Sequence, residues 1–264
     1  MNVKSVLIFD SGIGGLSIYL EINKLIPNQH IIYAFDNAAF PYGEQEDDVL
    51  VTRVCGMVSA LCAEYNIVLV VIACNTASTL VLPYLRELLS IPVVGVVPAI
   101  KPAAEISQSK KIGLLATPAT VKRAYTRQLV QDFAFSCEVT MVGSTRLVQM
   151  SESMLRGIAV DKDELQAVLS PFMGEVDCIV LGCTHFTLIK DKIEDVVGES
   201  CQVIDSSKSI ANRVAGFLIK EGQKAFLNKH PHWVFSSASV NEEAVLNQEF
   251  CQIGFLSIQR VPIF

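Results

Sequence analysis

The stretches VIACNT (Val71–Thr76) and VLGCTH (Val180–His185) repeat one arrangement, in which a cysteine separates an apolar run from a polar pair. The apolar runs, Ile67–Ile72 and Cys178–Leu181, are typical of buried parallel strands. A helical pattern follows each cysteine, so both thiols are predicted where a strand ends and a helix begins. In open α/β sheets, ligands bind at this edge.

A cysteine at the start of a helix carries an activated thiol, because the exposed N–H groups and the helix dipole favour the thiolate. Lowering a thiol pKa from about 8.5 to about 7 raises the ionised fraction at pH 7 from about 3% to about half. The same helix ends can hold a carboxylate ligand.

Most cysteines are inert small hydrophobic residues, and this chain has eight. We interpret Cys74 and Cys183 as candidate catalytic thiols because they share the motif. The other six are predicted to be structural: Cys55, Cys62, Cys137, Cys178, Cys201 and Cys251.

Composition bounds the size of the fold and argues against nucleic-acid-binding and membrane-spanning proteins. The 264 residues, 51% hydrophobic and 18% charged, suffice for one large or two small domains. A net charge of −6 without a dense basic run argues against a nucleic-acid partner. No apolar stretch reaches the roughly 20 residues of a membrane span, and no signal-peptide pattern is present. We therefore expect a cytoplasmic protein with reduced thiols.

Similar apolar runs alternate with helical patterns along the chain, which predicts an α/β fold with mainly parallel sheets. The predicted strands are Ser5–Phe9, His30–Phe35, Ile67–Ile72, Ile91–Val97, Lys111–Leu115, Val139–Val142, Cys178–Leu181 and Val203–Asp205. The prolines in Pro98–Pro102 mark a crossover between domains.

We expect two similar domains that face each other across an active-site cleft. The first comprises residues 1–98 and 208–264, and the second comprises residues 99–207. The β pattern at Trp233–Phe235 is expected to complete the first domain.

Further polar residues follow the predicted strands. Asp10 precedes a glycine turn that lacks the Gly-x-Gly-x-x-Gly spacing of dinucleotide sites; it suits an ammonium ligand, an orienting role or a helix cap. The turn Phe40–Gly43 is either an ordinary loop or a set of N–H groups for a carboxylate. Thr117 and Thr120, before a helix predicted over Val121–Val130, are caps or anion ligands.

A metal site is not predicted. Cys183 and His185 could supply two ligands, but no second pair with ligand spacing accompanies them.

Five motifs occur in a fixed order: Asp10–Gly12 (DSG), Pro41–Gly43 (PYG), Cys74–Thr76 (CNT), Thr117–Thr120 (TPAT) and Cys183–His185 (CTH). In this order, and over essentially the whole chain, the sequence resembles the cofactor-independent aspartate/glutamate racemase family. The Asp-Ser-Gly start and the Pro-Tyr-Gly motif resemble its glutamate branch.

The resemblance implies an isomerase that interconverts L- and D-glutamate without a cofactor and supplies D-glutamate for peptidoglycan. It implies that Cys74 works on D-glutamate and Cys183 on L-glutamate, assisted by Asp10 and His185. Asp36 and Glu152 are implied as secondary acidic helpers. The implied substrate-binding residues are Asp10, Ser11, Pro41, Tyr42, Gly43, Asn75, Thr76, Thr117, Thr120, Thr184 and His185. The expected partner is the small-molecule substrate, and a homodimer is the one assembly considered.

Two other functions stay open. A thiol hydrolase or transferase could use Cys183 with His185, and a non-catalytic protein of the same fold could bind an amino acid or a nucleotide. The duplicated cysteine favours the racemase, since inversion at one carbon needs a proton acceptor and a proton donor on opposite faces.

Overall fold

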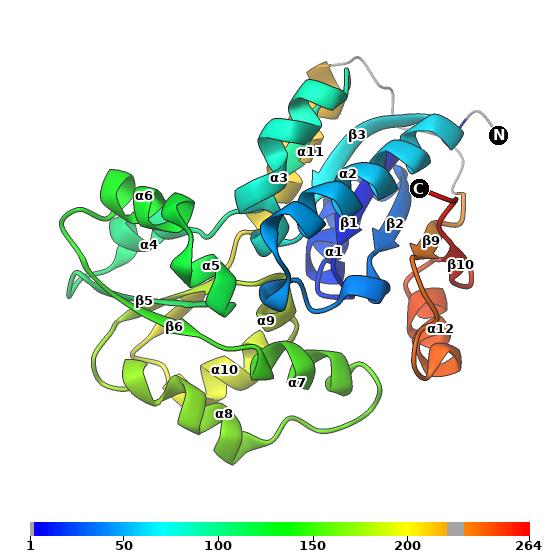
Figure 1. Cartoon of the computed structure of the whole chain (residues 1–264). Helices are drawn as coiled ribbons and strands as arrows, with labels where there is room; N and C mark the ends of the chain where they lie inside the picture. The colour runs from blue at the N-terminus through cyan, green and yellow to red at the C-terminus, as the bar shows by residue number, and fades with distance from the viewer. Residues whose placement is uncertain (1–2, 221–229) are drawn as a thin grey trace. The chain divides into compact units, whose positions relative to one another are not determined.

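The structure is a computed structural model that describes residues 3–220 and 230–264. The chain divides into two compact units. The first unit comprises Met1–Val96 and Ser207–Phe264, and the second comprises Val97–Ser206. In Figure 1 the first unit includes the blue and the orange-to-red elements, and the second includes the green ones.

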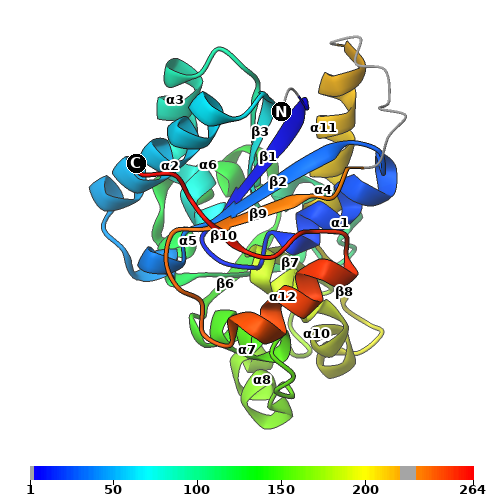
Figure 2. The ribbon, with the colours of Figure 1, turned by 90° about the vertical axis from the view of Figure 1, so that its right-hand side faces the viewer.

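The first unit contains a six-stranded sheet in the order β10-β9-β2-β1-β3-β4, and its strand pairings are parallel (Figure 2). Every residue of β1 and β2 is buried, which explains the apolar runs Val6–Phe9 and Ile31–Phe35 within them. The strands are β1 (Ser5–Asp10), β2 (His30–Phe35), β3 (Ile67–Ile72), β4 (Val93–Gly95), β9 (Trp233–Ser236) and β10 (Gln259–Arg260).

Helices cover both faces of this sheet. Leu7 and Phe9 of β1 belong to the core that includes α2 and α3, whereas the alternate residues of the strand face the other side. Helix α1 packs against α11. The helical elements are α1 (Leu16–Leu25), η1 (Asn37–Ala39), η2 (Tyr42–Glu44), α2 (Asp47–Glu64), α3 (Asn75–Leu88), α11 (Ser207–Lys220) and α12 (Glu243–Gln252).

The second unit contains a parallel four-stranded sheet in the order β6-β5-β7-β8. Its strands are β5 (Lys111–Ala116), β6 (Glu138–Gly143), β7 (Cys178–Gly182) and β8 (Gln202–Ile204). Its helical elements are α4 (Ile100–Ile106), α5 (Pro118–Lys122), α6 (Ala124–Phe133), α7 (Arg146–Met154), α8 (Lys162–Leu169), η3 (Ser170–Phe172), α9 (Thr184–Leu188) and α10 (Lys190–Val197).

The two sheets share a strand order that the sequence does not display. The order β2-β1-β3-β4 in the first unit corresponds to β6-β5-β7-β8 in the second. In each, the chain winds outward in opposite directions from a central pair, β1 with β3 or β5 with β7. Such a pair is a topological switch point, where the connections leave a crevice at the carboxyl ends of the strands. The predicted α/β class with parallel sheets is confirmed.

Two predicted elements differ in detail. The strand expected over Ile91–Val97 is shortened to β4, and the helix expected over Val121–Val130 is interrupted at Arg123, whose backbone is extended. Thr126 Oγ donates to the Thr120 carbonyl at 2.6 Å. This hydroxyl replaces the backbone N–H that a continuous helix would have supplied to that carbonyl.

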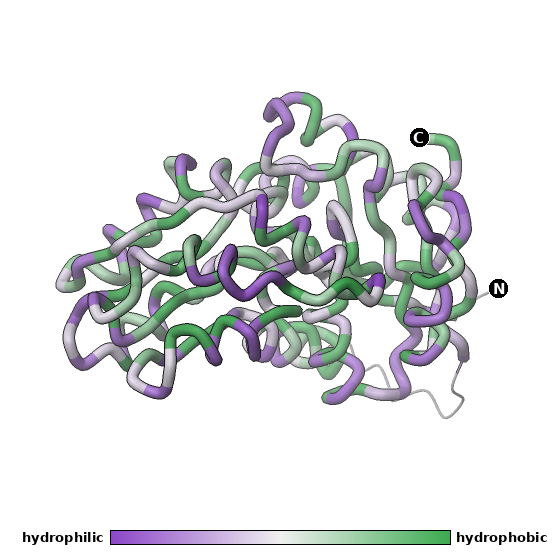
Figure 3. The backbone as a smooth tube through the Cα atoms, turned by 90° about the horizontal axis from the view of Figure 1, so that it is seen from below, coloured by the Kyte–Doolittle hydropathy of each residue, from purple (hydrophilic) through white to green (hydrophobic). Residues whose placement is uncertain are grey.

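Figure 3 shows hydrophobic stretches in green interleaved with hydrophilic stretches in purple along the whole described chain. These stretches are short. Among residues 3–220 and 230–264, no helix has both the length and the apolar content needed to cross a membrane.

Two glycines of the first unit provide a matched test of its packing. A Cβ on Gly15 would lie 2.9 Å from the Tyr33 hydroxyl and 3.1 Å from Asp10 Cβ, whereas a Cβ on Gly216 would meet nothing within 4 Å. We expect Gly15→Ala to lower the free energy of unfolding by about 1–3 kcal/mol through overpacking. Gly216→Ala, in helix α11, should raise it by about 0.5–1 kcal/mol.

Urea unfolding followed by the fluorescence of Trp233, the chain's single tryptophan, measures both effects because Trp233 lies in the first unit. Equal stability of the two variants would contradict the close packing at Gly15.

Candidate active site

In the first unit, three predicted site residues lie at the carboxyl ends of three neighbouring strands. Asp10 ends β1, Asp36 follows β2, and Cys74 follows β3 after one intervening residue. The backbone ladder continues to this edge, since the Asp36 N–H donates to the Asp10 carbonyl at 3.1 Å. The parallel sheet therefore brings together residues that are up to 64 positions apart in sequence (10 to 74).

Cys74 is the N-cap residue of α3, with an extended backbone and a side chain that is 6% exposed. Its Sγ accepts a hydrogen bond from the Ala77 N–H at 3.4 Å and lies 3.8 Å from Ser11 Oγ. A helix N–H directed at the sulfur stabilises negative charge on it. The placement predicted for Cys74 is thus observed.

Asp10 is fully buried, and its carboxylate accepts hydrogen bonds from two backbone groups of the glycine turn. The Ser11 N–H donates at 2.7 Å and the Gly15 N–H at 2.5 Å. Gly15 is the N-cap of α1, so Asp10 fulfils the local role of holding the start of a helix. This contact also fixes the carboxylate beside Ser11, the residue that Cys74 approaches.

Asp36 is the centre of a buried polar cluster. Arg53 of α2 donates to both of its carboxylate oxygens, at 2.6 and 2.7 Å. The Tyr42 hydroxyl donates at 2.8 Å, and the Ser237 hydroxyl, just beyond β9, at 2.6 Å. Burial opposes ionisation of Asp36, but these donors outweigh it, so the pKa of the carboxyl lies below its usual value.

This cluster holds Tyr42, the centre of the predicted Pro-Tyr-Gly motif. Tyr42 is 1% exposed, and burial together with the Asp36 carboxylate raises the pKa of its phenol well above the usual value. The Phe40–Pro41 peptide bond is cis, and Pro41 is followed by the turn η2. The hydroxyl–carboxylate contact of Tyr42 with Asp36 thereby helps to anchor this motif to the sheet.

In the second unit, Cys183 is the N-cap residue of the five-residue helix α9 and is 7% exposed. Its Sγ lies 4.0 Å from His185 Nδ1. His185 Nε2 lies 2.9 Å from Glu152 Oε1, so the imidazole connects the thiol with a carboxylate of α7. Sulfur and ring are buried, and the carboxylate side chain is 12% exposed.

His185 is almost fully buried, which by itself would lower its pKa. Hydrogen bonds and charge interactions with Cys183 and Glu152 outweigh this effect and raise the pKa of the imidazole well above its usual value. Both contacts therefore favour the protonated form of the ring.

Thr117 and Thr120 begin α5 at the end of β5, the neighbour of β7. Thr117 caps the helix, because its Oγ accepts from the Thr120 N–H at 3.3 Å and also contacts Thr120 Oγ at 3.0 Å. Three more predicted binding residues are buried polar side chains, at 3–4% exposure: Asn75, Thr76 and Thr184. The side-chain amide oxygen of Asn75 (Oδ1) has no hydrogen-bond partner among the described residues.

Sequence reasoning missed Arg53, Ser237 and Arg156, which contact the carboxylates of Asp36 and Glu152. Arg53 and Ser237 are distant from Asp36 in sequence and carried no motif. Arg156 lies four residues after Glu152, a spacing that places side chains together on a helix.

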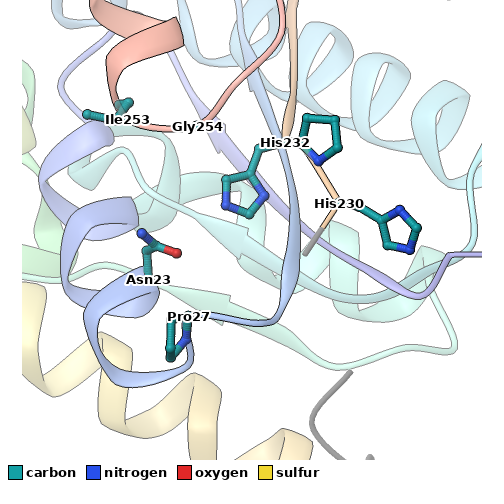
Figure 4. A pocket seen from close by; sticks show the side chains of 7 residues that line it. Asn23, Pro27, His230, His232, Ile253 and Gly254 are labelled. Atoms are coloured by element: carbon teal, nitrogen blue, oxygen red, sulfur yellow. The ribbon is translucent and has the colours of Figure 1, made fainter. Parts of the chain in front are cut away.

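A separate pocket of about 260 Å³ lies in the first unit (Figure 4). It is lined by Asn23, Pro27, His230, Pro231, His232, Ile253 and Gly254, none of which is a predicted site residue. The Ile31 N–H donates to His232 Nδ1 at 3.2 Å, and His30 Nε2 donates to the Pro231 carbonyl at 3.0 Å. These histidines tie β2 to the segment before β9.

Comparison with known proteins identifies the family of this chain. A sequence profile described as Asp/Glu/Hydantoin racemase matches residues 11–214. The chain belongs to the Asp/Glu/hydantoin racemase family. It is 53% identical over 254 residues to a glutamate racemase of Vibrio cholerae, covering 96% of this chain and 95% of that protein. A glutamate racemase of Aliivibrio fischeri is 53% identical over 256 residues, and the match covers 97% of each protein.

The structure also resembles a solved racemase of the family. The crystal structure of Escherichia coli glutamate racemase with L-glutamate and the activator UDP-MurNAc-Ala superposes with a TM-score of 0.92 at 43% identity. The match covers 99% of both chains. The resemblance stated from the five motifs is confirmed, while the role of each motif residue stays a prediction.

The Asp36 cluster predicts a pH-dependent stability. Since the pKa of Asp36 is lowered on folding, its stabilisation is complete above the unfolded-state value of about 3.9 and is lost as the pH falls through the folded-state value. We expect Asp36→Asn to lower the free energy of unfolding by about 3 kcal/mol between pH 5 and 7, because Arg53 loses its buried partner. The deficit should shrink below about pH 4.

Urea unfolding followed by Trp233 fluorescence at several pH values measures this deficit. Asp48→Asn is the matched control, since Asp48 is exposed on the same helix as Arg53 and should change stability by less than about 0.5 kcal/mol. A deficit that does not change with pH would contradict an ion-pair role for Asp36.

Proposed function

We propose that this racemase interconverts L- and D-glutamate by a two-base mechanism in which Cys74 and Cys183 act on opposite faces of the α-carbon. The observation that supports it most is the equivalence of the two thiols. Each follows the third strand of the same four-strand order and begins the next helix, at a topological switch point. The relatives at 53% identity, which are glutamate racemases, support the choice of substrate.

The proposed mechanism requires each sulfur to come within about 3–3.5 Å of the α-carbon, so that the two sulfurs are about 6–7 Å apart at reaction. In our proposal the domains 1–98 with 208–264 and 99–207 each supply one thiol. Neither thiol can replace the other, because each reaches only one face of the carbon.

On L-glutamate, the Cys183 thiolate removes the α-proton and Cys74 delivers a proton to the opposite face. The protonated His185 ring stabilises the thiolate and is itself held by Glu152. In the reverse direction, Cys74 is the base. The Ala77 N–H and the neighbouring Ser11 hydroxyl stabilise its thiolate, and Asp10 fixes this turn.

The substrate carries two carboxylates and one ammonium, and its carbanion needs further stabilisation by donors. We propose that the hydroxyls of Ser11, Thr76, Thr117, Thr120 and Thr184 and the backbone N–H groups of Tyr42 and Gly43, which follow Pro41, supply them. A buried acceptor without a donor costs about 1–3 kcal/mol. The side-chain amide oxygen of Asn75 (Oδ1) is such an acceptor, which supports the binding of a substrate group that donates to it.

The same proposal covers the cellular role. A cytoplasmic enzyme of this kind, needing neither a cofactor nor a metal, would supply D-glutamate for peptidoglycan. Asp36 is proposed to hold the Pro-Tyr-Gly turn through Tyr42, and a homodimer is the assembly we would test first.

One observation favours a second candidate. The thiol–imidazole–carboxylate chain of Cys183, His185 and Glu152 is the arrangement that thiol hydrolases use. A hydrolase would need only this thiol, whereas the proposed racemase needs both.

Substitution of single thiols separates these candidates. We expect Cys74→Ala and Cys183→Ala each to lower racemisation by at least about 10²–10³-fold in both directions, since each direction needs both groups. Circular dichroism with D- or L-glutamate and no added cofactor measures the rates. Cys251→Ala, at an exposed free cysteine, is the control and should retain full activity. Loss of turnover only in Cys183→Ala would indicate the hydrolase instead.

Isotope labelling tests the two-base mechanism directly. With pure L-glutamate in deuterated water, Cys183 removes protium and Cys74 delivers deuterium already exchanged from solvent. The D-product should therefore carry α-deuterium from the first turnover, while the remaining L-glutamate keeps its protium early in the reaction. Proton NMR after chiral separation measures both. Protium retained in the product, or equal early labelling of both enantiomers, would mean that one base serves both faces.

A further inference from the structure

Arg156, just beyond the end of α7, holds the carboxylate that contacts His185. Its Nη1 donates to Glu152 Oε2 at 2.8 Å and to the Glu152 backbone carbonyl at 2.7 Å. The Arg156 side chain is 15% exposed and that of Glu152 is 12% exposed, so this ion pair is mostly withdrawn from solvent. Ion pairs in such surroundings are screened less than surface pairs.

The two carboxylate oxygens of Glu152 have different partners. Oε2 accepts from Arg156, and Oε1 lies 2.9 Å from His185 Nε2. The guanidinium therefore fixes the rotation of the carboxylate that presents Oε1 to the ring. The other ring nitrogen faces Cys183 Sγ at 4.0 Å.

We propose that Arg156 is a positioning residue for the Cys183 thiol: it keeps Glu152 ionised and oriented, and Glu152 in turn keeps His185 protonated and turned toward the sulfur. This inference rests on the proposed function, because it assigns to Arg156 a part in the proton transfer at Cys183.

The charges around the ring support this order of action. Two titratable groups contact His185: Cys183, from the start of its own helix, and Glu152, from α7. Both raise the pKa of the ring against the effect of burial. Lys190 of the following helix pairs instead with Asp205 at 3.1 Å. Arg156 thus affects His185 through Glu152, which contacts both residues.

A purely structural role for Arg156 gives different expectations. Its bond to the Glu152 carbonyl satisfies a group in the last turn of α7, and a cation at that position favours the helix. If this were its whole role, a substitution would lower stability and leave the protonation chemistry unchanged. The experiment therefore measures protonation.

The variants are Arg156→Met, which removes the charge, and Arg156→Lys, which keeps it. We expect Arg156→Met to lower kcat about tenfold with little change in KM. The acid limb of its pH–rate profile should move up by about 0.5–1 pH unit, because a carboxyl that loses a guanidinium takes up a proton more readily. Arg156→Lys should restore the position of the acid limb.

Two controls isolate the pathway through Glu152. Arg146→Met removes an exposed cation at the other end of α7, where Arg146 pairs with Glu164, and should leave the profile unchanged. In a Glu152→Gln background, adding Arg156→Met should change kcat by less than about twofold, since the carboxylate on which Arg156 acts is already gone.

NMR of the imidazole gives a readout that does not need turnover. The hydrogen-bonded Nε2 proton of His185, assigned by its loss in His185→Asn, should exchange faster with solvent in Arg156→Met than in the wild type or in Arg156→Lys. Suppose that the wild type racemises glutamate, but that Arg156→Met leaves both the exchange of the Nε2 proton and the pH–rate profile unchanged. That result would overturn the role of Arg156. Absence of glutamate racemisation in the wild type would instead refute the proposed function, and the NMR result would still decide the contact.

Discussion

The candidate site depends on one topological constraint, the opposite winding of the chain on either side of a central strand pair. Parallel strands bring their carboxyl ends to one edge, and β1 with β3, like β5 with β7, forms the pair from which the connections diverge. Residues that follow these strands lie at the edge where a doubly wound sheet leaves room for a ligand. Cys74 and Cys183 occupy this place in both units, and their side chains are held at the start of the following helix.

Equivalent places in the fold have nevertheless acquired different surroundings. Cys74 receives a backbone N–H from the first turn of a 14-residue helix. Cys183 begins a helix of only five residues, has no such bond, and faces the His185 ring instead. Cys74 is therefore contacted by a helix N–H, whereas Cys183 faces an imidazole that has a carboxylate partner of its own. This imidazole–carboxylate pair lies largely away from solvent, with side-chain exposures of 3% for His185 and 12% for Glu152.

The sequence predicted those parts of the structure that are local. The strand–cysteine–helix units, the Thr117 cap and most strands depend on neighbouring residues, and they lie where predicted. The break at Arg123 was missed because it depends on a hydrogen bond from Thr126 to the Thr120 carbonyl. Neither the Arg53–Asp36 pair nor the shared strand order could be predicted, since both arise from contacts between distant segments with no motif. Only long-range packing places Ser237 on the carboxylate of Asp36.

The two residues predicted as acidic helpers, Asp36 and Glu152, have different hydrogen-bond partners. Asp36 accepts four hydrogen bonds, from Arg53 twice, Tyr42 and Ser237, and a carboxylate has about four acceptor positions. Protonating it would break a buried ion pair, so it is suited to holding Tyr42 rather than to exchanging a proton. Glu152 instead presents one oxygen to the His185 ring, which faces a thiol. In the proposed mechanism its charge acts on the thiol through that ring, so a change at Glu152 would reach the sulfur, whereas a change at Asp36 would first alter the position of a turn.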